Sequence, residues 1–433
     1  MKAMSKRGIG MKPSNVRWGV ITLLFFATTI NYLDRTNLSV ALPKIAANLH
    51  WGPAAMGAIS SAFLLSYGLL QLPVGALIDK LGTRLTYIWS IILWSLASMA
   101  TSIANSFGIL YLFRLILGVG EAPAFPAATK TAADWIPRKQ RGIATGFFTA
   151  GVNVGSAVAL PLVAWIVTAF GWRTSFIVTG LLGFVWLIFW LIFYKDRHQN
   201  PRVNAAEQAL IDAGTENELI EEQKVPYAKL FGRKSTWGLM LGYFCQVYIM
   251  YVFITWLPSY LVTARHMSLL KTGIYGMLPF IFGAVFAFLG GVLSDQWVKV
   301  NRNGRKYAMV IGLICGVAVI PAVFVSAWQW ALVFLTIAES GIMFSNGAAW
   351  GACSEIAPRG QAGSVASMQN FGGNVGGYFA PLLTGILVQN SGNFVSALVL
   401  SGALAVVGAL CYFILLPSSK TTDVIASESG LHM

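Results

Sequence analysis

Apolar runs of about 20 residues, each long enough to cross a bilayer as a helix, recur along almost the whole chain. Six begin near residues 18, 54, 85, 107, 141 and 172, and six more near residues 237, 270, 306, 331, 361 and 394. Only 11% of the 433 residues are charged, whereas about a quarter are charged in ordinary soluble domains. The sequence therefore predicts an all-α membrane protein with twelve transmembrane helices and excludes a soluble fold.

The net charge of +14 is explained by where the cationic residues lie. On this count of spans, few Lys or Arg residues fall in the outward loops: Lys44, Arg173, Arg265 and Lys271. Three more fall within spans: Arg35, Arg114 and Lys130. Nearly all the others lie on one side, which predicts that both termini and the central loop are cytoplasmic. The charge thus reflects membrane orientation, and we expect no nucleic-acid partner.

The spans form two groups of six, separated by a polar stretch. We expect a cytoplasmic tail at 1–17, an N-terminal six-helix bundle at 18–194, a cytoplasmic linker at 195–236, a C-terminal six-helix bundle at 237–416 and a cytoplasmic tail at 417–433. The linker mixes both signs of charge, and its sequence predicts a short surface helix around Ala205 to Ala213. A regulatory role for the linker is the alternative to a plain connection.

The two halves are similar in sequence. IPRKQRG…NVGS at 136–156 is matched by APRGQAG…NVGG at 357–377, with a constant offset of 221 residues. GALIDKLGTR at 75–84, after the second span, is matched by a degenerate copy that begins at Gly291, after the eighth. Two similar halves with cytoplasmic termini are typical of transporters that bind their substrate near the bilayer midplane.

With these motifs the chain resembles the major facilitator superfamily over nearly its whole length. GALIDKLGTR matches the superfamily's loop signature G-x-L-x-D-x-x-G-x-R. We assign this loop and its second copy to a conformational latch formed by Gly75, Asp79, Gly82, Arg84 and Asp295. In this interpretation Asp79 pairs with a cation in one state only, and Arg84 is the local candidate. A plain tight turn with solvated charges is the alternative.

NYLDRTNLSV at 31–40 and RLILGVGEAPAFP at 114–126 resemble more narrowly the anion:cation symporter family. Bacterial members of this family carry sugar acids with protons, and the likeness is to galactonate, glucarate and hexuronate transporters. The resemblance implies a secondary transporter of the bacterial inner membrane, not an enzyme, that imports an aldonate, aldarate or hexuronate with protons. It implies no cofactor and no metal, and we expect a monomer.

Four charged residues lie within the first and fourth spans: Asp34, Arg35, Arg114 and Glu121. Charges at this depth are costly and usually mark a transport pathway. Arg114 and Glu121 are two helical turns apart on one face, a rise of about 10.5 Å. The alternative is that the four charges form two structural salt bridges, although buried ion pairs stabilise a fold less well than apolar packing does.

We assign Arg35 and Arg114 to the substrate carboxylate, because a guanidinium makes two parallel hydrogen bonds to that group. Asp34 and Glu121 are the candidates for proton coupling. Burial favours the neutral acid and a nearby cation favours the carboxylate, so substrate binding to arginine should promote proton uptake. The resemblance also implies that the carboxyls at these two positions are proton-linked.

Polar and aromatic side chains are expected to bind the hydroxyl groups of a sugar acid. The candidates, most of them implied by the resemblance, are Tyr67, Gln71, Asn153, Trp350 and Asn370. Packing is the alternative role of Trp350. Asn153 is offered because Val152 stands where a polar residue is expected in the fifth span, and a role in helix packing is its alternative. The small-xxx-small pairs Gly142/Gly146, Gly151/Gly155 and Gly372/Gly376 predict close helix contacts.

Two other functions use the same scaffold. Proton-coupled efflux of amphipathic compounds predicts an apolar, acidic cavity, and the two inward arginines count against it. A non-transporting membrane sensor predicts a large soluble output module, which no polar segment of this chain is long enough to form. Glu339, in the tenth span, has no counterpart in the matched motifs. It faces an outer vestibule, binds a cation or lies nearer the surface than the span boundary suggests.

Overall fold

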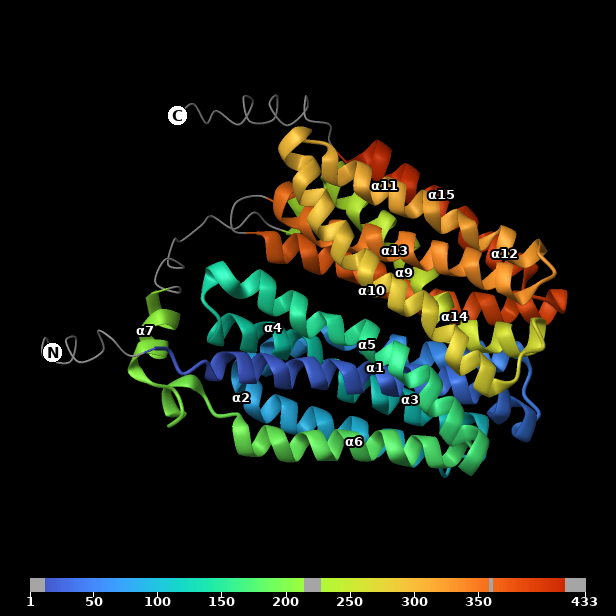
Figure 1. Ribbon diagram of the computed structural model, residues 1–433, viewed down its shortest axis with the longest axis horizontal. Helices are drawn as coiled ribbons and strands as arrows, with labels where there is room; N and C mark the ends of the chain where they lie inside the picture. The colour runs from blue at the N-terminus through green and yellow to red at the C-terminus, as the bar shows by residue number, and fades with distance from the viewer. Residues whose placement is uncertain (1–11, 214–226, 358–360, 417–433) are drawn as a thin grey trace, which may run out of the picture. The chain divides into compact units, whose positions relative to one another are not determined.

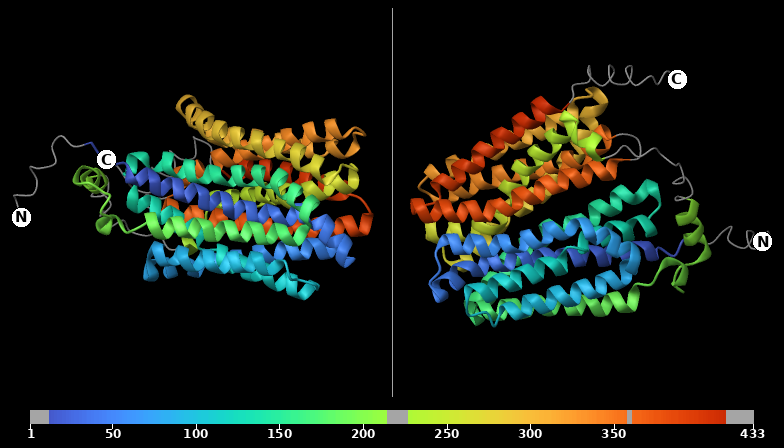
Figure 2. Two further views of the ribbon diagram at one scale, coloured as in Figure 1. Left: turned by 60° about the horizontal axis from the view of Figure 1, so that its bottom comes forward. Right: turned by 180° about the vertical axis from the view of Figure 1, so that it is seen from behind.

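The computed structural model describes residues 12–213, 227–357 and 361–416. These residues form only helices and loops (Figures 1 and 2), so the all-α prediction is confirmed. The helices up to the linker are α1 (Val16–Leu49), α2 (Pro53–Thr101), α3 (Phe107–Glu121), α4 (Ala124–Trp135), α5 (Arg138–Phe170), α6 (Trp172–Phe193) and α7 (Ala205–Ala213). Those after it are α8 (Tyr227–Phe231), α9 (Lys234–Ser259), α10 (Leu269–Val300), α11 (Gly304–Gly316), α12 (Pro321–Phe324), α13 (Trp328–Ile356), α14 (Ala362–Ser391) and α15 (Val395–Leu415). Short non-α turns lie at Arg197–Gln199, Tyr260–Ala264 and Val317–Val319.

Eleven helical segments in the described residues are long and apolar enough to cross a membrane. The remaining expected span, near residue 85, is the second part of α2. That part is separated from the first at Gly82, whose φ of 76° and ψ of 161° interrupt the helix in a region that side chains with a Cβ rarely adopt. Arg84 and the hydroxyl-bearing residues Ser90, Ser95 and Ser98 make this second part of α2 less apolar than the other spans.

Packing divides the chain into two compact units. Unit 1 comprises Met1–Asn37, Leu65–Ala159 and Phe170–Glu221, and unit 2 comprises Leu38–Leu64, Leu160–Ala169 and Glu222–Met433. Parts of α1, α2 and α5 therefore group with the second half of the chain. The domain boundaries expected from the sequence differ from this division and stay predictions, and the tail at 417–433 lies outside the described residues.

Glycines bring helices into close contact at two of the three predicted pairs. In unit 1, a Cβ added to Gly155 would lie 2.3 Å from the carbonyl oxygen of Thr29, so α5 packs directly on the α1 backbone. In unit 2, a Cβ on Gly376 would lie 2.2 Å from the Phe244 carbonyl oxygen, and α14 packs on α9 in the same way. The prediction is wrong for Gly142/Gly146, where a Cβ added to either glycine would meet nothing within 4 Å in the described part of the chain.

Helix α13 is central to unit 2, where it packs on α10, α11, α9 and α14. It begins and ends 221 residues after the α3–α4 segment begins and ends. The sequence repeat is thus reproduced in the helix boundaries.

The linker helix α7, which has the predicted bounds Ala205–Ala213, is anchored to the start of α1 (Figure 1). Oε1 of Glu207 accepts hydrogen bonds from the Arg17 amide at 3.1 Å and from Nη1 of Arg17 at 2.9 Å. Oε2 accepts from the Val16 amide at 3.1 Å and from the Ser14 hydroxyl. The first amides of a helix have no partner within the helix, so Glu207 acts as the N-terminal cap of α1.

Asn204 completes this anchor. Its side chain accepts from the Glu207 amide at 2.9 Å, which caps α7, and donates to the Lys12 carbonyl at 2.8 Å. Burial opposes the charge on Glu207, but the hydrogen bonds from Ser14, from the Arg17 and Val16 amides and from the Arg17 side chain together lower the pKa of Glu207 below its ordinary value. The linker is therefore tied to the first helix by a charged, hydrogen-bonded contact.

Candidate functional site

A cluster of buried charges lies in unit 1, where the fourth expected span breaks into α3 and α4. Pro123 follows the last residues of α3 and α4 starts at Ala124, as the two prolines in EAPAFP predict. The end of α3 packs closely on α2, since a Cβ on Gly120 would lie 2.7 Å from the Trp94 amide nitrogen. Ser90 also donates to the Gly120 carbonyl. These contacts fix the position of Glu121.

Arg35 and Glu121 form a buried ion pair. Nε of Arg35 lies 2.7 Å from Oε2 of Glu121, and the Glu121 side chain is 0% exposed. The guanidinium carbon of Arg35 lies 4.7 Å from the ring centre of Tyr32 and 4.8 Å from that of Tyr67. Such cation–π contacts favour a desolvated cation, so Arg35 is held by one carboxylate and two aromatic rings.

Asp34 points to a different set of neighbours. Oδ1 of Asp34 accepts a hydrogen bond from the Ser98 hydroxyl at 3.0 Å, and Ser98 lies 3.4 Å from the Thr179 hydroxyl. Asn37 donates to Thr179 at 3.0 Å. This network joins α1, α2 and α6, and it separates the environment of Asp34 from that of Arg35, as their rotation of about 100° along one helix predicts.

Arg114 is the least satisfied member of the cluster. It is buried, with its guanidinium carbon 5.2 Å from the ring centre of Phe176 on α6. Asp34 and Glu121 attract it electrostatically, yet its Nε and Nη2 have no hydrogen-bond partner among the described residues. Of the two structural salt bridges that the sequence allowed, the described residues thus form only Arg35–Glu121.

The other candidates of unit 1 lie close to this cluster or beside it. Tyr67 is buried against Arg35. Gln71 donates to the Ala122 carbonyl at 3.3 Å and so ties α2 to the α3–α4 break. Asn153 is half-buried on α5, between the two glycines that pack on α1.

Two candidates lie in unit 2. Trp350 on α13 is 47% exposed, and its ring meets that of Tyr243 on α9 edge-on at 5.8 Å. Tyr243 also donates from its hydroxyl to Asn346 at 3.3 Å. Asn370 on α14 is half-buried. The contact with Tyr243 accounts for one side of Trp350, and the exposed remainder stays available for another role.

The two copies of the loop motif carry different ion pairs. Asp79, which is 74% exposed, pairs with Lys130 of α4, whereas the expected partner was Arg84. In the second copy Asp295 accepts from Arg305 at 2.6 Å, and Arg305 also pairs with Glu355 of α13 at 2.7 Å. The sequence analysis did not assign Lys130, Arg305 or Glu355 to these ion pairs, because each lies on a different helix from its aspartate or arginine partner. Gly75 is exposed and Gly82 forms the break in α2.

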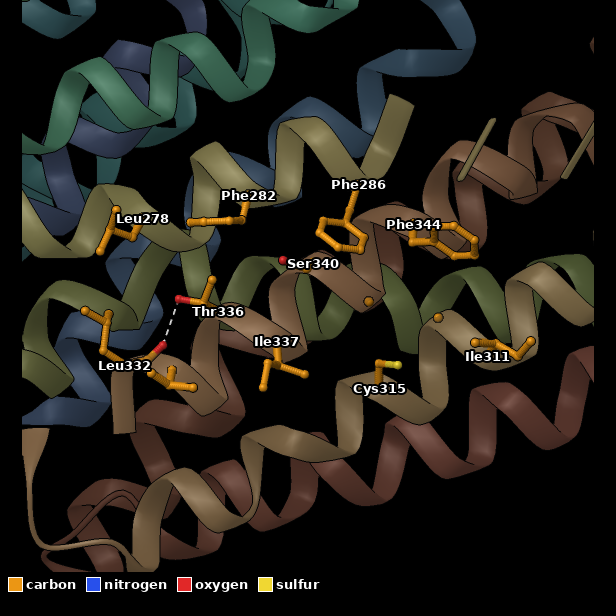
Figure 3. Close-up of a pocket in the computed structure, with 13 residues that line it drawn as sticks. Leu278, Phe282, Phe286, Ile311, Cys315, Leu332, Thr336, Ile337, Ser340 and Phe344 are labelled. Carbon is orange, nitrogen blue, oxygen red and sulfur yellow. Dashed lines mark hydrogen bonds between the residues drawn. The ribbon is translucent and has the colours of Figure 1, made fainter. Parts of the chain in front are cut away.

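An open cavity lies elsewhere, in unit 2 between α10, α11 and α13 (Figure 3). It has a volume of about 500 Å³. Its lining is almost wholly apolar and includes Phe282, Phe286 and Ile337, with Thr336 and Ser340 as the hydroxyl-bearing side chains. None of the described residues that line it is charged, so it does not fit an organic anion. Within the described residues, no group of three or more His, Cys, Asp or Glu side chains is arranged to hold a metal ion.

Sequence reasoning missed Tyr32, Asn37 and Ser98 around the cluster. It also missed Tyr243 and Asn346 beside Trp350 in unit 2. Tyr32 lies three residues before Arg35, on the same helical face, which was a usable signal. The partners on α2 and α6 gave no such signal, because isolated Ser and Thr residues are common in membrane helices.

Comparison with known proteins agrees with this fold. Residues 24–381 match the Major Facilitator Superfamily. The chain is 35% identical over 400 residues to the probable L-galactonate transporter of Escherichia coli (strain K12), covering 91% of this chain and 88% of that one. It is 31% identical over 436 residues to the probable galactarate/D-glucarate transporter GudP of the same strain, covering 95% and 96%.

A solved structure shares the fold. The bacterial homolog of the human lysosomal transporter Spinster matches with a TM-score of 0.75 at 20% identity, over 93% of this chain and 97% of that one. The chain belongs to the Major Facilitator Superfamily. It is a multi-pass membrane transporter and not an enzyme.

Proposed function

We propose that the chain imports a sugar-acid anion together with protons by alternating access. The observation that carries this proposal is the buried guanidinium of Arg114, whose Nε and Nη2 have no hydrogen-bond partner among the described residues. Two donors of one guanidinium are complementary to the two oxygens of a carboxylate. The names of the galactonate and galactarate/glucarate relatives favour a sugar acid as that anion.

Proton coupling would use the Arg35–Glu121 pair. While Glu121 is ionised it holds Arg35 through the 2.7 Å contact. Protonation of Glu121 removes this attraction and releases Arg35 to bind a substrate carboxylate. Proton uptake and anion binding then favour each other, because Arg35 serves one carboxylate at a time. Asp34, with its hydrogen bond from Ser98, is the second proton-coupling candidate.

The sugar hydroxyls would be bound by the remaining candidates, Tyr67, Gln71, Asn153, Trp350 and Asn370. A dicarboxylate would engage both Arg114 and Arg35, and a monocarboxylate Arg114 first, since Arg35 is already paired. We assign the protein to the bacterial inner membrane with both termini in the cytoplasm, from the asymmetry of Lys and Arg. The ion pairs of Asp79 and Asp295 are proposed to form and break as the transporter changes state.

Thermal stabilisation of the purified protein in detergent tests this function. The ligands are galactonate, gluconate, glucarate, glucuronate and galacturonate, each beside a neutral sugar of matched stereochemistry, at acidic and at neutral pH. A ligand at 100 times its dissociation constant should stabilise the protein by about 2.7 kcal/mol. A shift with one acid, absent with its neutral partner and lost in Arg114→Ala, is the expected result. Stabilisation by lipophilic cations but by no acid would overturn the proposal in favour of efflux.

A further inference from the structure

Glu339 is a buried acid that the proposed mechanism does not use. It lies on α13, inside the candidate membrane span Trp328–Cys353, and is 1% exposed. Its burial rules out the interpretation that it lies near the surface or faces a vestibule in this conformation. On the adjacent helix α10, a Cβ at Gly283 would lie 3.4 Å from Cγ of Glu339. The side chain of Glu339 therefore packs against the middle of α10.

Among the described residues, no cation balances this carboxyl group. The charged side chains on the helices packed against α13 lie towards the helix ends: Lys234 on α9, Lys271, Asp295 and Lys299 on α10, and Arg305 and Lys306 on α11. Helices α12 and α14 carry none. Gly283 is twelve residues from both Lys271 and Asp295, a rise of about 18 Å in each direction. The other titratable side chains of these helices are tyrosines and cysteines, which are neutral at neutral pH.

Hydrogen bonding does not compensate for the missing charge either. Oε2 of Glu339 has no hydrogen-bond partner among the described residues, and no charged group there interacts with it electrostatically. An isolated carboxylate in such a place carries a large desolvation penalty, whereas the neutral acid carries a much smaller one. These surroundings therefore favour the neutral acid over the carboxylate.

We propose that Glu339 is a second proton-binding site, separate from the charge cluster of unit 1, that holds one proton in this conformation and releases it in another state of the transport cycle. The release rests on the proposed function, whereas the bound proton does not. A proton fits the site better than a metal cation does, because a cation such as sodium needs several oxygen ligands and Glu339 offers the only carboxylate in this part of the helix packing described here.

A cavity borders the helix that carries Glu339. The cavity of about 500 Å³ runs along the neighbouring face of the same helix, where Thr336, Ile337 and Ser340 line it (Figure 3). Glu339 and Ser340 differ by about 100° around the helix axis. A rotation of α13 about its axis would change the contact of Glu339 with α10.

Infrared spectroscopy of the purified protein tests the bound proton, independently of any transport. We expect the C=O stretching band of a protonated carboxylic acid at neutral pH in the wild type, reduced by one group in Glu339→Gln. The amide variant mimics the neutral acid in size and charge, so it should fold. Thr336→Val, on the preceding turn, is the matched control and should leave the band unchanged. Equal bands in the wild type and in Glu339→Gln would overturn the proposal.

Proteoliposomes test the release. The number of protons moved per sugar acid, obtained from the reversal potential, should fall by one in Glu339→Gln and stay unchanged in Thr336→Val. If Glu339 stays neutral throughout the transport cycle, the number of protons moved per sugar acid is the same in Glu339→Gln as in the wild type. That result would overturn the proposed release of the proton. Uptake that is driven by sodium and lost in Glu339→Gln would show that Glu339 binds sodium instead of a proton. If the wild type moves no sugar acid at all, the proposed function fails, while the infrared band still decides whether Glu339 binds a proton.

Discussion

The α3–α4 segment and α13 have the same boundaries 221 residues apart, yet they distribute charge in opposite ways. The first contains Arg114 and Glu121, whereas the second has Leu335 and Ile342 at the corresponding positions, both buried. Glu339 lies one turn before the counterpart of Glu121. The repeat thus preserved the bounds of the helical segment, but among the described residues only the first copy carries a buried ion pair in its interior.

The loop motifs show the reverse relation. Both copies keep an aspartate in an ion pair, Asp79 with Lys130 and Asp295 with Arg305. Charge is therefore repeated at the helix ends, where it is partly exposed, and is unequal in the interior, where it is expensive. A duplicated fold can retain its solvated contacts and still concentrate its buried chemistry in one copy.

The largest expected effect concerns Arg114. Arg114→Ala should weaken sugar-acid binding by at least about 30-fold, since truncating one partner of a buried charge contact costs about 2–5 kcal/mol. Arg114→Lys keeps the charge but not the two parallel donors and should recover only part of the affinity. Titration calorimetry measures both, with the exposed Arg173→Lys as control. Wild-type affinity in Arg114→Ala would mean that the interior charges of the first half are structural.

The second effect concerns Glu207, the cap that ties the first half to the linker. Glu207→Ala should lower the free energy of unfolding by about 3 kcal/mol, the typical cost of breaking a buried ion pair. Because hydrogen bonds lower the pKa of Glu207 in the folded state, this stabilisation is present above the unfolded pKa of about 4.3. It is lost as pH falls through the folded pKa.

Thermal unfolding across pH measures this difference. The gap in melting temperature between the wild type and Glu207→Ala should be full at pH 7 and shrink below about pH 4. Asp212→Asn, which removes a more exposed acid from the same helix, is the control. A gap that does not change with pH would show that the cap acts through packing instead of charge.

A third effect separates binding from coupling. Glu121→Gln imitates the protonated acid and removes the charge that holds Arg35. At neutral pH the variant should therefore bind the sugar acid about tenfold more tightly than the wild type does, as tightly as the wild type binds it at acidic pH. The dependence of affinity on pH should become much weaker. Binding measured from pH 5 to pH 8 checks this, and a wild-type pH profile in the variant would count against Glu121 as the proton-coupling group.

The smallest effect on stability is expected at the loop motifs. Asp79→Asn should change the free energy of unfolding by less than about 1 kcal/mol, because exposed ion pairs contribute little. Asp295→Asn should cost more, since Arg305 is mostly buried and bridges two acids. Both variants should alter the rate of transport more than substrate affinity. If both variants lose the same free energy of unfolding, the ion pairs of the two motif copies contribute equally to stability, contrary to this prediction.

The sequence carries enough information for the spans, but not for the pairing of their charges. Hydropathy located α10 and α13 within a few residues, because a bilayer imposes helix length. It could not show that Arg35 pairs with Glu121 while Arg114 lacks such a bond. That outcome depends on how the helices approach one another, as α3 approaches α2 at Gly120 and α5 approaches α1 at Gly155. For the same reason Asp79 meets Lys130, 51 residues away, instead of the nearby Arg84.

The cap of α1 has a consequence for the order in which the chain is assembled. The amides of Val16 and Arg17 are bonded by a carboxylate about 190 positions later. During synthesis the ribosome must make the following five spans before Glu207 emerges, so the start of α1 stays incomplete throughout that time. Insertion of the first half and completion of its first helix are thus separate events. The capping of α1 by Glu207 can occur only after the first six spans have been made.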